Sequence, residues 1–218
     1  MTETAAPLGN LSSAIVGAIQ KWDRKPADFY PTPPDVTYSL RPHILDILPE
    51  KSLVLEPACG DGAMAKALVE CGYDVYGCDL RQESGYGDGG VNFLETDFSD
   101  LGYDAVITNP PFNIADKFIE HSMKQAPVVA MLLKSQYWHA AKRRRLFETH
   151  RPTRVLPLTW RPSFLEKERG SSPLMDVMWV VWAAGANHTD YYPIQRVTSP
   201  PYPRPVSLSE DDFDSIFA

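Results

Sequence analysis

The stretch LVLEPACGDG, residues 53–62, decides the fold. Its apolar beginning, together with the preceding Ser52, predicts a buried strand over residues 52–55, and its two glycines predict a sharp turn. The segment AMAKALVECG that follows predicts a helix over residues 63–72, with Gly72 as its C-cap. A strand that turns through glycines into a helix is typical of the first unit of a parallel α/β sheet.

Short apolar runs and helical patterns continue to alternate along the chain. We expect further helices over residues 113–125 and 138–149. Further strands are expected over residues 74–78, 91–94, 104–108, 128–133, 154–158 and 177–182. Strands that alternate with helices form right-handed βαβ units. The sequence therefore predicts an α/β fold with a seven-stranded, mostly parallel sheet and helices on both faces.

Composition limits the classes of protein to which this chain can belong. Its 218 residues are 44% hydrophobic and carry a formal net charge of −7, which excludes wholesale disorder and argues against binding nucleic acid or membrane through bulk charge. The N-terminal apolar stretch has no basic region before it, and three cysteines do not form a disulfide framework, so we expect a cytoplasmic protein without membrane spans.

Composition also changes at both ends of the chain. We predict a flexible lead-in over residues 1–25 and one domain over residues 26–190. Residues 191–218 are rich in proline and end in an acidic cluster, which predicts an extended tail. This tail is either solvated or a linker or partner-binding peptide.

Three acidic residues stand at the ends of the first two predicted strands. Glu56 and Asp61 flank the glycine turn, and Asp79 closes the second strand. An anionic pyrophosphate would be poorly held beside them, whereas a cationic ligand or sugar hydroxyls would be well held. Asp79 also stands at about the spacing from Glu56 at which a strand-end acid meets a ribose. The alternative is a tight turn whose acids face solvent.

The strand predicted over residues 104–108 ends in Asn109-Pro110-Pro111-Phe112. Two prolines fix the backbone and remove two N–H donors, so the polar groups left at the strand end are carbonyl oxygens and the Asn109 amide. These carbonyl oxygens can accept hydrogen bonds from an NH2 group, and Phe112 offers a flat face to a planar ring. The alternative is an ordinary proline turn.

These motifs resemble those of the S-adenosylmethionine-dependent amino-methyltransferases, most closely the DNA N6-adenine type of bacterial and phage enzymes. The turn EPACGDG, residues 56–62, is similar to the cofactor loop of that family, and Asn109-Pro110-Pro111-Phe112 matches its catalytic tetrapeptide. The segment FYPTP, residues 29–33, is similar to the one that packs on the methionine end of the cofactor, and Asp97-Phe98 matches the position that contacts the cofactor adenine. The resemblance covers roughly residues 28–184.

The resemblance implies a Rossmann-like class I methyltransferase that transfers a methyl group to N6 of a flipped-out adenine in DNA, without a metal. Asn109, Pro110, Pro111 and Phe112 are the implied catalytic residues. The implied cofactor-binding residues are Tyr30, Pro31, Thr32, Glu56, Pro57, Ala58, Cys59, Gly60, Asp61, Asp79, Leu80, Asp97, Phe98 and Asn109. Adenine in RNA and a protein glutamine amide remain alternative substrates, and a cofactor-binding subunit without turnover is an alternative of another class.

Residues 117–169 hold 12 of the 21 basic residues and four acidic ones, a net charge of +8. Residues 142–145, Lys-Arg-Arg-Arg, either contact phosphates or form a solvated helix surface, because four consecutive residues cover every face of a helix. Lys134, Tyr137, Arg161 and Phe164 are the candidate substrate contacts. For Arg161 and Phe164 the alternative is local packing, and either Tyr137 or Trp138 is expected in the core.

This sequence departs from the family in its target-recognition domain. The segment between Asp97 and Asn109 is too short to hold one, and only the predicted tail follows the last predicted strand. Sequence specificity therefore comes from short loops, is relaxed, or depends on an accessory partner or a second subunit. We expect a monomer or homodimer that binds DNA and no membrane.

Overall fold

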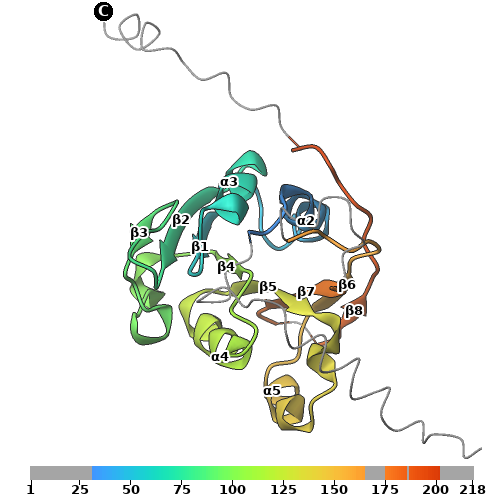
Figure 1. The fold of residues 1–218 in the computed structure, drawn as a ribbon. Helices are drawn as coiled ribbons and strands as arrows, with labels where there is room; N and C mark the ends of the chain where they lie inside the picture. Colours follow the sequence, from blue (N-terminus) through green and yellow to red (C-terminus); the bar gives the residue numbers. More distant parts are fainter. Residues whose placement is uncertain (1–30, 165–174, 186, 202–218) are drawn as a thin grey trace, which may run out of the picture.

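The computed structural model describes residues 31–164, 175–185 and 187–201 (Figure 1). The expectations for residues 1–25, for Tyr30 and for the acidic end of the chain lie outside these residues. Eight strands form a single sheet in the order β3-β2-β1-β4-β5-β7-β6-β8. The strands are β1 (Leu53–Glu56), β2 (Asp74–Asp79), β3 (Asp88–Gly89), β4 (Ala105–Thr108), β5 (Val128–Lys134), β6 (Arg154–Pro157), β7 (Val177–Ala183) and β8 (Asp190–Tyr191).

The sheet is mostly parallel, as expected, and β7 runs antiparallel to both of its neighbours, β5 and β6. The strand count of seven is wrong. No strand forms over residues 91–94, because the Asn92 side chain accepts a hydrogen bond from the Leu94 amide and starts a 3-10 helix, η2 (Phe93–Glu95). Two short edge strands, β3 and β8, make the total eight. Two-residue strands carry too little pattern to be predicted from sequence.

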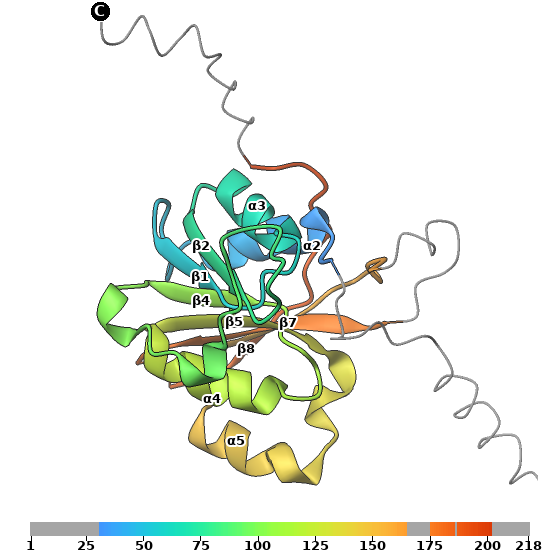
Figure 2. The ribbon, with the colours of Figure 1, turned by 60° about the vertical axis from the view of Figure 1, so that its left-hand side comes forward.

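Helices cover both faces of the sheet, as Figure 2 shows with the sheet near edge-on. One face carries α2 (Pro34–Leu40) and α3 (Ala63–Glu70), and the other carries α4 (Ala115–Gln125) and α5 (Arg144–Thr149). The side chains of β5 alternate between the two cores: Leu132 joins the core under α2 and α3, and Leu133 joins the core over α4. A central strand buried on both faces has to be apolar throughout, which explains the run VVAMLL.

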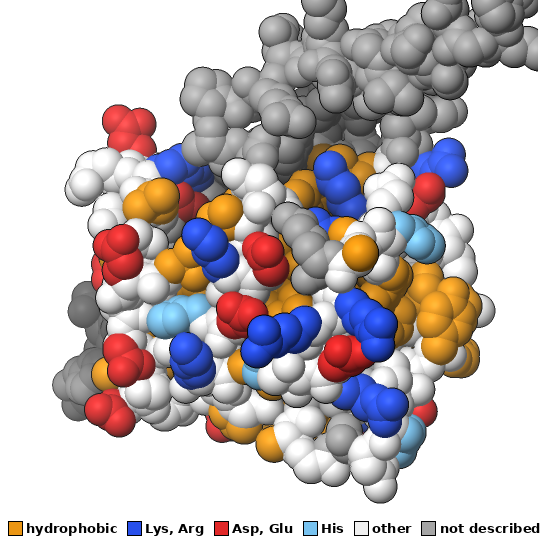
Figure 3. Space-filling model, turned by 90° about the horizontal axis from the view of Figure 1, so that it is seen from below, with side chains coloured by type: hydrophobic (Ala, Val, Ile, Leu, Met, Phe, Trp, Pro, Cys, Tyr) orange, Lys and Arg blue, Asp and Glu red, His pale blue; other side chains and the backbone are white. Residues whose placement is uncertain are grey.

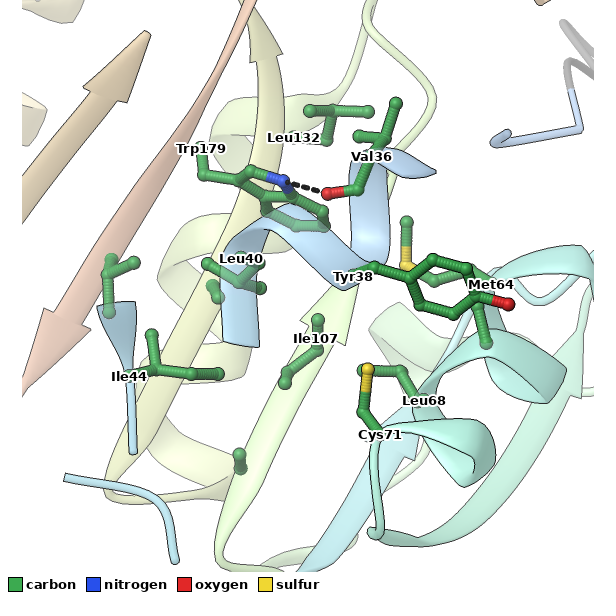
Figure 4. Close-up of a cluster of buried hydrophobic side chains, with 14 of the residues drawn as sticks. Val36, Tyr38, Leu40, Ile44, Met64, Leu68, Cys71, Ile107, Leu132 and Trp179 are labelled. Carbon is green, nitrogen blue, oxygen red and sulfur yellow. Dashed lines mark hydrogen bonds between the residues drawn. The ribbon is translucent and has the colours of Figure 1, made fainter. Parts of the chain in front are cut away.

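The core under α2 also fixes the segment that leads into this helix. The indole Nε1 of Trp179, on β7, donates a hydrogen bond to the Val36 carbonyl over 3.0 Å (Figure 4). Trp179 is fully buried, and the cluster around it includes Leu40, Ile107 and Leu132. Residues 31–33, which precede α2, are thereby held against the sheet.

The helix expected over residues 138–149 is interrupted. The chain forms two 3-10 turns, η4 (Ser135–Trp138) and η5 (Ala141–Arg143), before α5 begins. The backbone is extended at Ala140, and the Trp138 indole packs on Phe147, with ring centroids 4.3 Å apart, while its Nε1 donates to Met178 Sδ. The packing of this half-buried indole decides the path of the chain over its local helix propensity.

The chain beyond residue 190 continues to pack on the domain. Ile194 is fully buried and forms a parallel bridge with Leu158. Arg196 pairs with the buried Asp35 of α2 over 2.6 Å, and the Val197 amide donates to Ser39 Oγ. The domain boundary predicted at residue 191 therefore lies inside the packed part of the chain. In the described ranges, no helix is both long and apolar enough to cross a membrane.

Candidate cofactor and substrate pocket

A pocket opens at the carboxyl ends of β1, β2 and β4. The order of the sheet reverses between β1 and β4, and this is the switch point at which open α/β sheets bind ligands. The described residues that line the pocket are Pro31, Thr32, Glu56, Pro57, Ala58, Cys59, Gly60, Asp61, Ala63, Met64, Asp79, Leu80, Arg81, Val91, Asn92, Phe93, Leu94, Asn109, Pro110, Pro111, Phe112, Ile114 and Phe118.

The glycine turn after β1 forms one wall of this pocket. Gly60 and Gly62 both have positive φ, at 61° and 80°, a conformation that side chains with Cβ rarely adopt. The Gly60 amide donates to the Asp79 carboxylate over 2.8 Å, and the other Asp79 oxygen accepts from the amide and the Nε of Arg81. Asp79, which we expected to meet a ribose, thus also ties the ends of β1 and β2 together.

The loop after β2 packs on the outside of the glycine turn. The Tyr86 side chain fills the space that a Cβ at Gly62 or Gly77 would occupy. Cys59 Sγ donates to the Tyr86 carbonyl over 2.9 Å. Burial raises the pKa of Cys59 to about 11, so the thiol is protonated at neutral pH. The contact with Tyr86 makes Cys59 part of the turn's support.

Glu56 places a buried carboxyl group on the pocket wall. Its side chain is 2% exposed, and Oε2 has no hydrogen-bond partner among the described residues. Burial, together with the charges of Asp61 and Asp79, raises the pKa of Glu56 to about 8. A buried carboxyl oxygen without a partner is costly unless a ligand supplies a donor or a positive charge.

The tetrapeptide after β4 forms the opposite wall. Asn109 Nδ2 donates to Thr32 Oγ1 over 3.1 Å, a contact between residues 77 positions apart in the chain. Asn109 Oδ1 is buried and finds no hydrogen-bond partner in the described part of the chain. The site therefore holds an acceptor oxygen ready for an N–H donor.

A lysine ammonium lies over one face of the Phe112 ring. The Lys134 ammonium, at the carboxyl end of β5, lies 4.4 Å from the Phe112 ring centroid. This distance is within the range of a cation–π interaction. The expected substrate contact Lys134 and the tetrapeptide thus lie together in the structure.

The structure brings together most of the cofactor-site residues inferred from sequence. The residues expected to bind cofactor or to act in catalysis that line the pocket are Pro31, Thr32, Glu56, Pro57, Ala58, Cys59, Gly60, Asp61, Asp79, Leu80, Asn109, Pro110, Pro111 and Phe112. Asp97 and Phe98 are absent from the described lining residues. Asp97 is exposed and accepts from the Ser99 amide, while Phe98 is buried and its amide donates to Gln125 Oε1.

Asn92, Phe93 and Leu94 line the pocket and were not predicted from the sequence, whereas Asp97 was predicted and does not line it. The error follows from the strand expected over residues 91–94, because the chain already turns at Asn92. The signal was available: Asn92 is a polar residue directly after Val91, at the point where the extended segment ends. Phe93 anchors this turn in the core, with its ring centroid 5.2 Å from that of Phe118.

The three other candidates for substrate contact have partners within the domain. Phe164 is 6% exposed and belongs to the core under α2. Its position agrees with the alternative of packing within the protein. Tyr137 is buried in the opposite core, with the Arg143 guanidinium 3.8 Å from its ring centroid. Arg161 is exposed and pairs with Asp176 over 2.7 Å.

Neighbouring basic residues of the segment 142–145 point in different directions. Arg143 turns inward onto Tyr137, whereas Arg144 is exposed and pairs with Glu148 over 2.7 Å. Figure 3 views the molecule from the side of α4 and α5 and shows Lys and Arg interspersed with Asp and Glu. In the described residues, no group of His, Cys, Asp and Glu is arranged to hold a metal ion.

No protein-family model matches the chain, and no curated protein matches its sequence significantly. Solved structures do match its fold. A Vibrio vulnificus protein named as a modification subunit of a type I restriction enzyme is 16% identical at a TM-score of 0.55, over 95% of this chain and 56% of that one. A Pyrococcus horikoshii protein named as an RNA methyltransferase is 17% identical at 0.55, over 80% of this chain and 98% of that one.

A third match comes from a Listeria monocytogenes protein named as a class I S-adenosylmethionine-dependent methyltransferase. It is 13% identical at a TM-score of 0.53, over 95% of this chain and 75% of that one. At such identities the likeness shows the fold alone, which this chain shares with the three proteins. This chain spans little more than half of the Vibrio subunit.

Proposed function

We propose that this chain, which has the class I methyltransferase fold, transfers a methyl group from S-adenosylmethionine to the N6 amine of adenine in DNA. The observation that carries the proposal is the position of Asn109 on the same pocket as the glycine turn, with its Oδ1 buried and left unpartnered by the described residues. An exocyclic amine has two N–H donors. Asn109 Oδ1 and the Pro110 carbonyl are two acceptors in adjacent positions.

The wall of the pocket that holds Glu56 suits the charged end of S-adenosylmethionine. The cofactor has an ammonium group and a sulfonium, and the unpartnered Oε2 of Glu56 is an acceptor on the same wall. The glycine turn lets the backbone approach the ligand closely, and the carboxylates of Asp61 and Asp79 disfavour an anionic ligand. This set of groups supports a cationic cofactor over a dinucleotide or triphosphate.

At the other end of the pocket, we place the cofactor adenine against Leu80 and the turn Asn92–Leu94. Leu80 is 68% exposed although it is a large apolar side chain, and it lines the pocket. An exposed leucine beside a pocket is a suitable surface for a planar base. In this arrangement Asn92 takes the place that the resemblance gave to Asp97.

The chain's own residues contribute positioning and electrostatics to the reaction. When bound, S-adenosylmethionine supplies an activated methyl group. Asn109 Oδ1 and the Pro110 carbonyl would accept the two amine hydrogens and favour the pyramidal nitrogen that attack requires. No nucleophilic side chain is needed, which agrees with the protonated thiol of Cys59.

A target adenine has to leave the DNA duplex to reach this pocket, at a cost of a few kcal/mol. Phe112 offers a stacking face for the flipped base. Lys134 lies over the ring of Phe112, so the base stacks either on the opposite face or after Lys134 has moved toward a phosphate. A cation beside the tetrapeptide supports a nucleic acid over a protein amide as substrate.

We also propose that a partner subunit or a second copy supplies sequence recognition. The Vibrio protein, whose fold this chain shares, is named as a modification subunit. The helical segment over α5 is short and its charges are mixed, so it offers little surface for reading bases.

The test is a transfer assay with methyl-labelled S-adenosylmethionine on pools of DNA, RNA and protein, followed by nucleoside and amino-acid analysis. We expect N6-methyladenine from DNA. Asn109→Ala should abolish transfer while cofactor affinity, measured by calorimetry, stays within about twofold. Asn187→Ala, at an exposed position, is the matched control and should keep full activity.

The other outcomes decide between the alternatives. Label only in RNA would overturn the DNA assignment in favour of an enzyme like the one for which the Pyrococcus protein is named. Label only at glutamine would assign a protein substrate. Tight cofactor binding without label in any pool would identify a binding subunit without turnover.

A further inference from the structure

The contact between Thr32 and Asn109 joins the segment before α2 to the end of β4. Thr32 is 4% exposed and lies between Pro31 and Pro33. Pro33 restricts the backbone of Thr32, and α2, which follows, is held by the Trp179 indole. The Thr32 hydroxyl is therefore a fixed hydrogen-bond partner for the Asn109 amide.

An asparagine amide can be turned by 180° with almost no change in shape, which exchanges its oxygen and its NH2 group. With Nδ2 toward Thr32, Asn109 leaves one buried acceptor, Oδ1, without a partner in the described chain. With Oδ1 toward Thr32, the Thr32 hydroxyl would donate to Oδ1, and neither N–H group of Nδ2 would have that partner. A buried N–H group without an acceptor is less readily tolerated than a carbonyl oxygen without a donor, so the pair favours the orientation observed, in which Thr32 accepts from Nδ2.

We propose that Thr32 is a positioning residue that orients the Asn109 amide with its oxygen toward the reacting amine. The proposal rests on the proposed function and deepens it, because it names how the site selects its substrate. With Oδ1 in the pocket, Asn109 and the Pro110 carbonyl form a pair of acceptors. With Nδ2 there, the site would present a donor beside an acceptor.

This orientation selects bases by the group at the reacting position. A base that carries an exocyclic amine donates to both acceptors. A base that carries a carbonyl at that position, such as hypoxanthine in place of adenine, would bring its oxygen against two acceptor oxygens and bind poorly. Thr32 thus favours amine-bearing bases without touching the base itself.

The first test compares Thr32→Val with Thr32→Ser in the transfer assay. Valine keeps the shape and removes the hydroxyl, and serine keeps the hydroxyl. We expect Thr32→Val to lower kcat about five- to tenfold with KM changed about twofold or less, and Thr32→Ser to restore most of the loss. Thr37→Val is the matched control: Thr37 is also buried, its hydroxyl has no hydrogen-bond partner in the described chain, and kcat should be unchanged.

A second comparison separates orientation from packing. Aspartate has two equivalent oxygens, so an Asn109→Asp carboxylate has no orientation to select. If Thr32 orients the amide, Thr32→Val should lower kcat in the wild-type background and have no further effect in Asn109→Asp. Equal losses in both backgrounds, or Thr32→Ser as slow as Thr32→Val, would overturn the proposal. Should Asn109→Asp be inactive, the serine and valine variants decide alone.

A readout that needs no turnover distinguishes this proposal from the proposed function. In protein labelled with 15N at asparagine side chains, the hydrogen-bonded proton of Asn109 Nδ2 should shift downfield and exchange slowly, and Thr32→Val should remove both effects. A protein that methylates nothing but shows this signal would contradict the proposed function and leave the Thr32–Asn109 contact established. An Asn109 signal that does not respond to Thr32→Val would overturn the role of Thr32.

Discussion

The carboxylate of Asp79, at the end of β2, accepts a hydrogen bond from the Gly60 amide, in the turn after β1, over 2.8 Å. The other oxygen of Asp79 accepts from the amide and the Nε of Arg81. Asp79 is 8% exposed, so these bonds are little screened by water. The shape of the glycine turn therefore depends on a side chain from the neighbouring strand.

Asp79→Asn should weaken cofactor affinity about tenfold or more, because an amide cannot accept all three bonds and Gly60 loses its charged acceptor. Calorimetric titration with S-adenosylmethionine measures this. Asp104→Asn is the matched control: Asp104 accepts from the Leu53 amide over 2.8 Å, where β1 begins and away from the pocket. It should lower the melting temperature and leave cofactor affinity unchanged. Unchanged affinity in Asp79→Asn would refute its role in the turn.

Glu56 predicts a pH-dependent affinity for a cationic cofactor. Its pKa is raised to about 8 in the free protein, mainly by burial, so the carboxyl is neutral at pH 6. Binding a cation favours the carboxylate and releases a proton. Affinity should therefore rise between pH 6 and pH 7.5, by at most about tenfold per pH unit.

Calorimetry at pH 7 in buffers of different ionisation enthalpy measures the released proton directly. Glu56→Gln should bind the cofactor more weakly and release fewer protons, whereas Glu95→Gln, at an exposed position, should match the wild type. The folded protein without ligand should also lose stability as pH rises from about 4.5 toward 8, because the folded state favours the neutral form of Glu56 and the unfolded state its carboxylate. Glu56→Gln should reduce that loss. Proton release that is identical in wild type and Glu56→Gln would contradict this assignment.

Lys134 predicts a salt-dependent contact with nucleic acid. Lys134→Gln should raise KM for DNA several-fold and reduce the slope of log affinity against log salt concentration by about one. Cofactor affinity should stay unchanged, because Lys134 contacts Phe112 and is absent from the described pocket lining. Lys124→Gln, an exposed lysine in the last turn of α4, is the control. A salt slope that Lys134→Gln leaves unchanged would rule out a phosphate contact.

Trp179 and Trp182, both on β7, are similarly buried, but they donate hydrogen bonds to different segments of the chain. The Trp179 indole donates to the Val36 carbonyl in α2, and the Trp182 indole donates to the His150 carbonyl after α5. Replacing either by phenylalanine should lower the free energy of unfolding by about 1–3 kcal/mol, through a lost hydrogen bond and a small cavity.

The tryptophan variants should differ in cofactor affinity. Trp179→Phe loosens α2, and with it the segment that carries Thr32 to the pocket, so affinity should fall several-fold. Trp182→Phe should leave affinity unchanged. Denaturant titration and calorimetry on both variants check this, and equal affinities would show that α2 does not position the pocket.

The two motifs nearest the chemistry could be found without coordinates. The turn over residues 56–62 and the tetrapeptide 109–112 are contiguous, and each directly follows an apolar run that had to be a strand. The carboxyl ends of parallel strands meet at one edge of a sheet, so the sequence predicts that these motifs line the same pocket. Of the described residues expected to bind the cofactor, Asp97 and Phe98 do not line this pocket.

What only the tertiary structure decided are the relations between segments that sequence does not align. Asn92 rather than Asp97 lines the pocket because the chain turns into a 3-10 helix at Asn92, where a strand was expected. Phe164 is buried, and the chain near Arg196 packs on α2, because both find partners that are distant in sequence. The bond from Thr32 to Asn109 spans 77 residues. Sequence determined most of the groups that reach the pocket. Long-range packing decided how they are held and which way the Asn109 amide points.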